Sequence, residues 1–148
     1  MRTVLIIGAG RSASSLIQYL LNKSVEEDLH LIIGDLSLES AQKKTNNHPN
    51  ATAISLDIFD QNQRQHAIQK ADIVISMLPA HLHIEVARDC IVYKKNMVTA
   101  SYISDAMQEL DVLAKENNLI FMNEIGLDPG IDHMSAMKVI HEIKNKGG

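Results

Sequence analysis

The chain has 148 residues, of which 45% are apolar and 22% are charged, and its formal net charge is −4. This balance is typical of one globular domain with a hydrophobic core and excludes a disordered or fibrous chain. The scattered basic residues exclude a nucleic-acid-binding stripe, and no apolar run approaches the roughly 20 residues that span a bilayer. We therefore expect neither nucleic acid nor a membrane as a partner. The single cysteine, Cys90, excludes an internal disulfide and favours a cytoplasmic location.

Short apolar runs alternate with amphipathic stretches along the whole length. Connections between them are short, and the apolar runs are apolar throughout, which is typical of parallel strands buried on both faces. The sequence therefore predicts a doubly wound α/β domain over 1–148, a Rossmann fold with a six-stranded parallel sheet whose ligands bind at the carboxyl ends of the strands. The predicted strands are 3–8, 29–35, 52–57, 72–79, 96–101 and 119–124, and the predicted helices are 12–23, 37–46, 60–71, 81–94, 104–117 and 131–146.

The first strand is followed by GAGRSA (8–13), which matches the G-x-G-x-x-A dinucleotide fingerprint where it opens a helix. Gly8 can adopt the dihedral angles of the tight turn, and Gly10, without a Cβ, lets a pyrophosphate approach the backbone. Ala13 allows the helix to pack closely on the strand, and the helix start at Ser12 offers free N–H groups. The alternative is a tight turn without a ligand.

Asp35 closes the second predicted strand, somewhat more than 20 residues beyond the glycines. A carboxylate at this place accepts hydrogen bonds from the adenosine ribose and repels a 2′-phosphate, so it favours NAD over NADP. Arg11 points to the opposite preference, because it can lean toward an adenosine phosphate. The structural alternative for Asp35 is a role beside Ser37, the predicted cap of the next helix.

The third and fourth strands end in further candidate cofactor residues. Asp57 and Ile58 can bond the adenine, although Asp57 can equally start a turn before Asp60, which has capping-box spacing to the next helix. Leu78 and Pro79 are expected beside the nicotinamide ribose. His81 and His83 follow, two residues apart at a helix start, so they point in different directions; no metal site is expected, and only His81 is considered as a neighbour of the substrate.

The fifth and sixth strands end in polar loops. Ser101 and Tyr102 suit a polar substrate or the nicotinamide amide, with ordinary turn chemistry as the alternative. The loop before the last helix carries Asp128, Pro129 and Gly130, and Gly130 leaves the backbone free where the helix N-terminus can face an anion. Capping of that helix is the alternative role for the acids in this loop, and it is the stronger one for Asp132.

Three stretches resemble the glutamate-forming saccharopine dehydrogenases, also called saccharopine reductases: SMLPAHLH (76–83), VTASYIS (98–104) and, most specifically, GLDPGIDHMSAM (126–137). Members of this family oxidise saccharopine with NAD(P) and hydrolyse the imine to glutamate and 2-aminoadipate 6-semialdehyde. The resemblance implies cofactor contacts from Gly8, Gly10, Ser12, Ala13, Asp35, Leu78 and Pro79, and a substrate-proximal group of Ser101, Tyr102, Asp128, Pro129 and Gly130. Within that group Asp128 is the candidate catalytic acid.

The resemblance also implies a second domain that carries much of the substrate site. We therefore expect this chain to be the cofactor-binding fragment of a longer enzyme, inactive by itself, with an amino-acid substrate in the full-length protein. Two alternatives stay open: a carboxylated-polyamine dehydrogenase of the same superfamily, and a free-standing nucleotide-sensing module. The sequence does not decide the oligomeric state, for which a homodimer is one arrangement considered.

Overall fold

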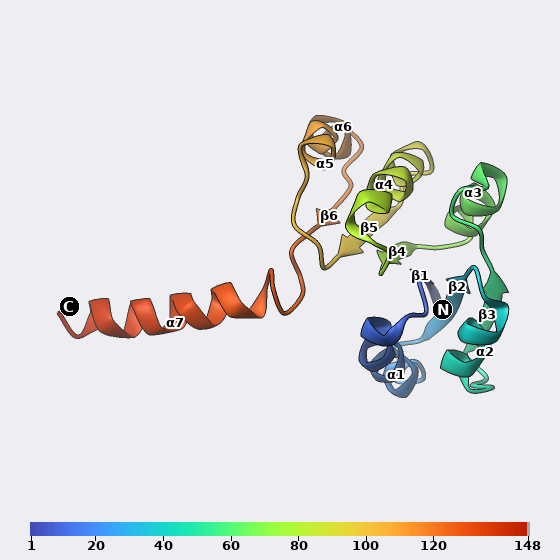
Figure 1. Ribbon diagram of the computed structural model, residues 1–148, viewed down its shortest axis with the longest axis horizontal. Helices are drawn as coiled ribbons and strands as arrows, with labels where there is room; N and C mark the ends of the chain where they lie inside the picture. Colours follow the sequence, from blue (N-terminus) through green and yellow to red (C-terminus); the bar gives the residue numbers. More distant parts are fainter. Residues whose placement is uncertain (148) are drawn as a thin grey trace.

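The computed structural model describes residues 1–147, which form one sheet of six parallel strands flanked by helices (Figure 1). The strand order is β3-β2-β1-β4-β5-β6, so the chain winds outward from β1 in one direction and then from β4 in the other. This confirms the predicted doubly wound fold and sets its switch point between β1 and β4. The strands are β1 (Arg2–Ile7), β2 (Leu29–Asp35), β3 (Ala51–Ser55), β4 (Ile73–Ser76), β5 (Asn96–Thr99) and β6 (Phe121–Met122).

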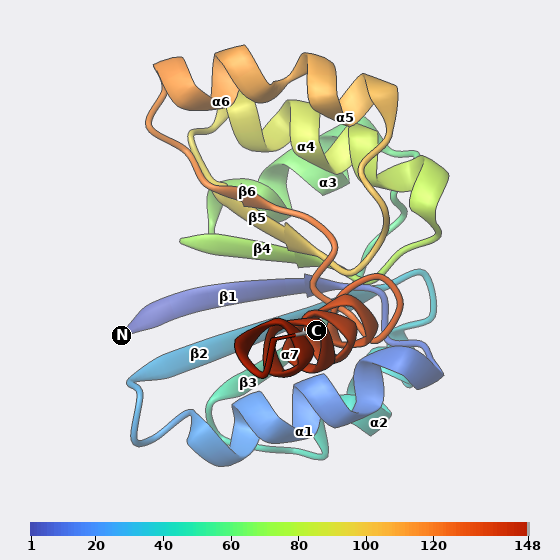
Figure 2. The same cartoon turned by 90° about the vertical axis from the view of Figure 1, so that its left-hand side faces the viewer.

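Helices cover both faces of the sheet, as Figure 2 shows: α1 and α2 lie on one side and α3 to α6 on the other. Two short 3₁₀ helices, η1 (Arg11–Ala13) and η2 (Ala80–Leu82), precede α1 and α4. The α-helices are α1 (Ser14–Lys23), α2 (Leu38–Thr45), α3 (Gln61–Gln69), α4 (His83–Val92), α5 (Asp105–Glu109), α6 (Asp111–Glu116) and α7 (Ile131–Asn145).

The central strand β1 supplies the core on both faces. Val4 and Ile6 pack with Ile17 of α1 on one side, whereas Leu5 and Ile7 join the cluster under α3 and α4 on the other. Since successive side chains of a strand point to opposite faces, an apolar run without alternation is what a strand covered on both sides requires.

The predicted helix caps are confirmed. The Ser37 hydroxyl accepts a hydrogen bond from the Ser40 N–H at 3.2 Å, and the Asp60 carboxylate accepts from the N–H groups of Asn62 and Gln63. The Gln63 side-chain Oε1 accepts from the Asp57 N–H at 3.2 Å, so the start of α3 also holds the loop that follows β3.

Several predicted elements are longer than those in the structure. β4 was expected to reach Pro79 but ends at Ser76, because its neighbours end there: Ser76 pairs with Ile7 of β1 and Thr99 of β5. β6 keeps only two residues, since β5 is its one partner among the strands described. The predicted helix 104–117 is divided at Leu110 into α5 and α6.

The core-facing stripe of α4 differs from the expected one. Helical spacing in 81–94 predicts that Ile84, Ala87 and Ile91 share one face, but Ile84 and Ile91 are only half-buried. The buried residues of α4 include Val86, Ala87 and Cys90, which pack under β4 and β5, and His83. Burial among these side chains raises the pKa of the Cys90 thiol to about 12, and Cys90 packs as a small core residue.

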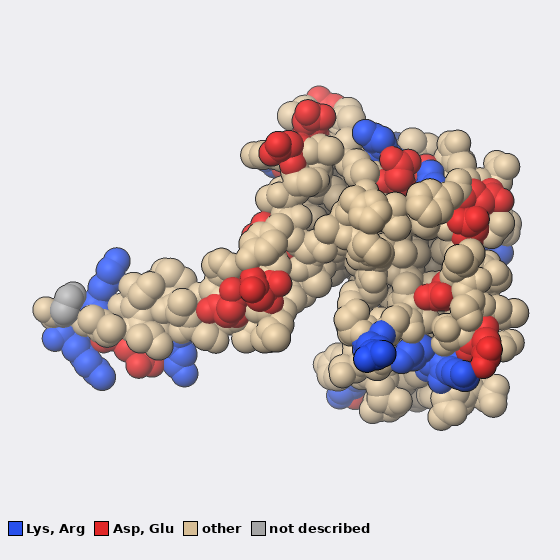
Figure 3. Space-filling model, in the orientation of Figure 1, with Lys and Arg blue, Asp and Glu red and all other residues tan. Residues whose placement is uncertain are grey.

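An uncharged stretch runs along the side of α7 that faces the viewer in Figure 3, with charged side chains near its two ends and along its lower edge. This helix projects away from the sheet, and none of its residues is buried against the rest of the described chain (Figure 1). Its exposed apolar residues include Met137, Val139, Ile140 and Ile143. Among residues 1–147 no helix has the length and apolar character needed to cross a membrane.

Candidate functional site

The turn after β1 depends on Gly8. Its φ is +104°, and a Cβ built on it would lie 2.9 Å from the Met77 carbonyl oxygen, so a side chain is excluded both by backbone conformation and by space. The next N–H, that of Ala9, donates to the Asp35 carboxylate at 2.7 Å. The turn is therefore fixed between the ends of β2 and β4.

Gly10 lies two residues on and has a different environment. It is exposed, and a Cβ built on it would meet no atom of the described residues within 4 Å. It begins η1 without a side-chain cap, and the adjoining residues Arg11 and Ser12 are also exposed. Ala13 is fully buried, so the helix packs closely on the sheet there. An open backbone at a helix start is where an anionic group can approach N–H groups.

A cavity of about 140 Å³ lies on one side of this turn and collects the residues predicted for the adenosine half. Backbone N–H groups hold both carboxylates in its lining. Asp35 accepts from Ala9 and, at 2.9 Å, from Ser37; Asp57 accepts from Phe59 at 2.9 Å. Its lining includes Gly8, Asp35, Asp57, Ile58 and Leu78.

A second cavity, of about 160 Å³, opens on the other side of the turn and shares Leu78 with the first. Ser12 and Ser101, both predicted site residues, line it. His83 lines it too, although its sequence position gave no reason to place it there. The only available signal was the spacing of His83, Val86, Ala87 and Cys90, which marks one face of a helix.

His83 joins three hydroxyl groups at the carboxyl ends of β4 and β5. Its Nδ1 lies 2.8 Å from the Ser76 Oγ, and its Nε2 lies 2.8 Å from the Ser101 Oγ and 3.0 Å from the Thr99 Oγ1. Burial, aided by the neighbouring His81, lowers the pKa of His83 below its usual value.

The loop between β6 and α7 brings Asp128 to Tyr102. The phenol donates to the Asp128 carboxylate at 2.6 Å, and this hydrogen bond raises the pKa of Tyr102 to about 12. Both side chains are exposed. The loop lies close against the end of β5: a Cβ built on Gly126 would be 3.0 Å from the Ala100 Cβ.

The other predicted residues of this loop make contacts within the loop itself. Pro129 and Gly130 are buried, and Gly130 has φ +145° with no room for a Cβ beside the Gly126 carbonyl. Asp132 accepts from the Gly130 N–H at 2.8 Å, which is the local role considered for it from the sequence.

The structure brings seven of the fifteen predicted site residues to the linings of the two cavities: Gly8, Ser12, Asp35, Asp57, Ile58, Leu78 and Ser101. The others line neither cavity: they are Gly10, Arg11, Ala13, Pro79, Pro129 and Gly130, and the exposed pair Tyr102 and Asp128. The two cavities share Leu78 in their linings, and the backbone at Gly10 is open. An open glycine turn at the carboxyl edge of a parallel sheet is a feature of dinucleotide-binding folds.

Comparison with known proteins identifies the family of the chain. Residues 4–122 match the model of the saccharopine dehydrogenase NADP binding domain. The chain is 39% identical over 147 residues to a saccharopine dehydrogenase [NADP(+), L-glutamate-forming] of Pyricularia oryzae, covering 99% of this chain and 32% of that protein. It is 35% identical over 162 residues to an alpha-aminoadipic semialdehyde synthase of Arabidopsis thaliana, covering 98% of this chain and 15% of that protein.

A solved structure shares the fold over nearly the whole chain. Apo saccharopine dehydrogenase (L-Glu forming) from Saccharomyces cerevisiae superposes with a TM-score of 0.87 at 35% identity, covering 99% of this chain and 32% of that one. The chain thus spans about a third or less of the length of these relatives. Together, the matched domain model and this structural likeness show that the chain belongs to the saccharopine dehydrogenase family, of which it is a dinucleotide-binding domain.

Proposed function

We propose that this chain is the cofactor domain of an NAD-dependent enzyme that oxidises saccharopine to glutamate and 2-aminoadipate 6-semialdehyde. The observation that carries the proposal is the pair of cavities that meet at Leu78 beside the Gly8–Gly10 turn. When bound, the nicotinamide cofactor supplies hydride-transfer chemistry. The residues of this chain bind it, with the adenosine half at the first cavity, the pyrophosphate at the glycine turn and the nicotinamide half at the second cavity.

The preference for NAD rests on Asp35. Its carboxylate lines the adenosine-side cavity and is fixed by the N–H groups of Ala9 and Ser37. A fixed negative charge at this point repels a 2′-phosphate and can accept from a ribose hydroxyl. The names of several relatives specify NADP(+), so this preference is a point on which we expect the chain to differ from them.

The preference is tested by charge reversal. For the 148-residue chain we expect NADH to bind at least tenfold more tightly than NADPH, and Asp35→Arg to reduce or invert that ratio. Titration of cofactor fluorescence gives both dissociation constants. Asp111→Arg, which makes the same charge change on exposed α6, is the matched control and should leave the ratio unchanged. Tighter binding of NADPH by the unaltered chain would contradict the preference.

On the substrate side we assign the reacting role to Asp128. The Tyr102 hydroxyl donates to Asp128 at 2.6 Å, and this hydrogen bond raises its pKa to about 12, still further above neutral pH than the ordinary value of a phenol. Tyr102 therefore positions the carboxylate rather than serving as a base. The other lone pairs of Asp128 remain able to accept from the N–H of a secondary amine, which holds the carbon that loses hydride in a fixed orientation.

The reaction itself requires a chain that continues to the length of the relatives. We expect such a chain to reduce NAD with saccharopine, followed by absorbance of the reduced cofactor, and Asp128→Asn to lower kcat at least a hundredfold while leaving NADH affinity intact. Turnover of a carboxylated polyamine in place of saccharopine would keep the cofactor assignment and overturn the substrate. Cofactor binding without turnover of either substrate would favour a nucleotide-sensing module.

A further inference from the structure

His83 is a buried imidazole that the cofactor contacts proposed above do not use. It is the first residue of α4, its residue exposure is 4%, and it lines the cavity of about 160 Å³. Its ring nitrogens bond hydroxyl groups from the ends of β4 and β5. A polar side chain buried at a strand edge is expensive unless it is fully bonded, so its presence at a ligand cavity needs a reason.

The three hydroxyl groups around His83 are not equivalent. Ser76 and Thr99 are buried, with residue exposures of 1% and 2%. Ser101 is half-buried, and its Oγ lies 2.8 Å from His83 Nε2 at the wall of the cavity. Ser76 and Thr99 therefore fix the ring, whereas Ser101 is the member of the group that a ligand can reach.

A neutral imidazole has one N–H donor and one acceptor nitrogen, so the bond to His83 sets which way the Ser101 hydroxyl points. If Nε2 accepts, the Ser101 oxygen is left to accept from a ligand; if Nε2 carries the proton, the Ser101 hydroxyl is left to donate. In both tautomers the bond to His83 takes up one hydrogen-bonding position of Ser101 and so decides which positions remain for a ligand.

We propose that His83 is a positioning residue that holds the Ser101 hydroxyl in one orientation for the carboxamide of the nicotinamide ring. This inference rests on the proposed function, which assigns the nicotinamide half to this cavity. A carboxamide offers both a donor and an acceptor, so it can match either orientation of a fixed hydroxyl. A neutral ring at this place also avoids repelling the positive charge of an oxidised nicotinamide.

The test compares two ligands that differ only in the nicotinamide. ADP-ribose reports on the adenosine half and the fold, whereas NADH reports on both halves. Asn at position 83 can reach toward the place of Nδ1, and Gln toward that of Nε2. We expect His83→Asn to weaken NADH binding five- to tenfold, the loss of one positioned hydrogen bond, and to leave ADP-ribose binding unchanged. His83→Gln should retain most of the NADH affinity.

Ser101→Ala completes a double-mutant cycle. Because His83 acts through Ser101, we expect Ser101→Ala to give a similar loss for NADH and the double variant to be little worse than either single one. Equal losses for NADH and ADP-ribose in His83→Asn would indicate a merely structural role and overturn the proposal. Additive losses in the double variant would also overturn it.

A measurement on the unaltered chain covers the case in which the variants do not fold. In ¹⁵N spectra of the histidine rings, we expect the Nε2 resonance of His83 to move when NADH is added and to stay in place when ADP-ribose is added. Movement with neither ligand, although both bind, would overturn the role of His83. Failure of the chain to bind ADP-ribose at all would instead overturn the proposed function.

Discussion

Gly8 and Gly10 stand two residues apart and serve different physical purposes. Gly8 is needed by the fold, since its φ of +104° and its distance to the Met77 carbonyl leave no place for a side chain. Gly10 has no such requirement, since a Cβ there would meet no atom of the described residues within 4 Å, and we expect a ligand to need the open space. The fingerprint therefore combines a folding residue and a binding residue, and substitution separates them.

We expect Gly8→Ala to lower the free energy of unfolding by about 2 kcal/mol, from left-handed strain and the contact with Met77. We expect Gly10→Ala to change it by less than about 0.5 kcal/mol, as at a site without contacts, yet to weaken NADH binding at least tenfold by blocking approach to the backbone. Denaturant unfolding and NADH titration of both variants give the two quantities. Unimpaired NADH binding by a folded Gly10→Ala chain would contradict a pyrophosphate site at this turn.

The place of residues that set the local backbone conformation, such as Gly8, could be predicted from the sequence. The contacts of His83 could not. The glycine spacing and the strand end at Asp35 are local signals, and Gly8 and Asp35 both line the first cavity. The bonds of His83 join residues from β4, α4 and the end of β5, which only the packed sheet brings together. A histidine two residues from another histidine gives no local sign of such a network.

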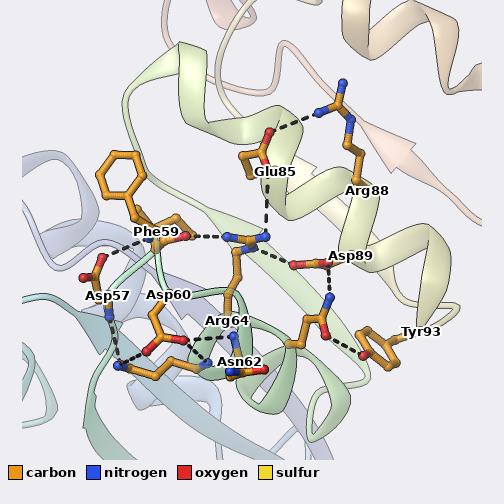
Figure 4. A network of polar contacts seen from close by, with 12 residues as sticks. Asp57, Phe59, Asp60, Asn62, Arg64, Glu85, Arg88, Asp89 and Tyr93 are labelled. Carbon is orange, nitrogen blue, oxygen red and sulfur yellow. Dashed lines mark hydrogen bonds and ion pairs between the residues drawn. The ribbon is translucent and has the colours of Figure 1, made fainter.

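At the scale of elements, α3 and α4 are joined by a buried charge network drawn in Figure 4. The Arg64 Nε lies 2.6 Å from the Asp89 carboxylate, and both side chains are 7% exposed. Arg64 also donates to the Ile58 carbonyl, and Gln65 donates to Asp89 at 2.9 Å. The network connects the loop after β3, which lines the adenosine-side cavity, to the helix that carries His83.

Removing one charge of the Arg64–Asp89 pair should lower the free energy of unfolding more than removing both charges. We expect Arg64→Met to lower the free energy of unfolding by about 3 kcal/mol, because Asp89 is left buried without its partner, and Arg64→Met with Asp89→Leu to cost less than Arg64→Met alone. Urea unfolding of the three chains measures this. Arg88→Met, which breaks an exposed ion pair with Glu85, is the control and should change stability little.

The order and type of the elements could be predicted from the sequence because each depends on local periodicity. The residues at which the strands end could not be predicted. β4 ends at Ser76 because both of its neighbours end beside it, which is a property of the sheet and not of the residues 77–79. β6 is short for another reason, which is also a property of the sheet: among the strands described it pairs with β5 alone. Leu78 and Pro79 therefore lie in a loop, where backbone at the carboxyl edge is available to a ligand.

At the scale of the whole molecule, α7 is the helix whose apolar side has no packing partner in the rest of the described chain. Its apolar residues Ala136, Met137, Val139, Ile140 and Ile143 lie on one side, as spacings of three and four require. A helix with such a side is stabilised by packing against another surface. Since the chain spans about a third of the Pyricularia and yeast relatives, we propose that the occupant is the additional part of a longer chain.

If the additional part of a longer chain packs on α7, substitution of its apolar side should affect the free energy of unfolding in the longer chain more than in the 148-residue chain. In the 148-residue chain, Ile140→Asp should change the free energy of unfolding by less than about 0.5 kcal/mol, because the side chain packs on nothing described. In a chain that continues to the length of the relatives, the same substitution should cost about 2 kcal/mol or more, since a charge would be buried. Lys138→Asp, on the polar side of α7, should have a small effect in both, and thermal unfolding of all four variants gives the comparison. A discrete dimer of the 148-residue chain in sedimentation, abolished by Ile140→Asp, would assign this surface to a second copy instead and contradict the proposal.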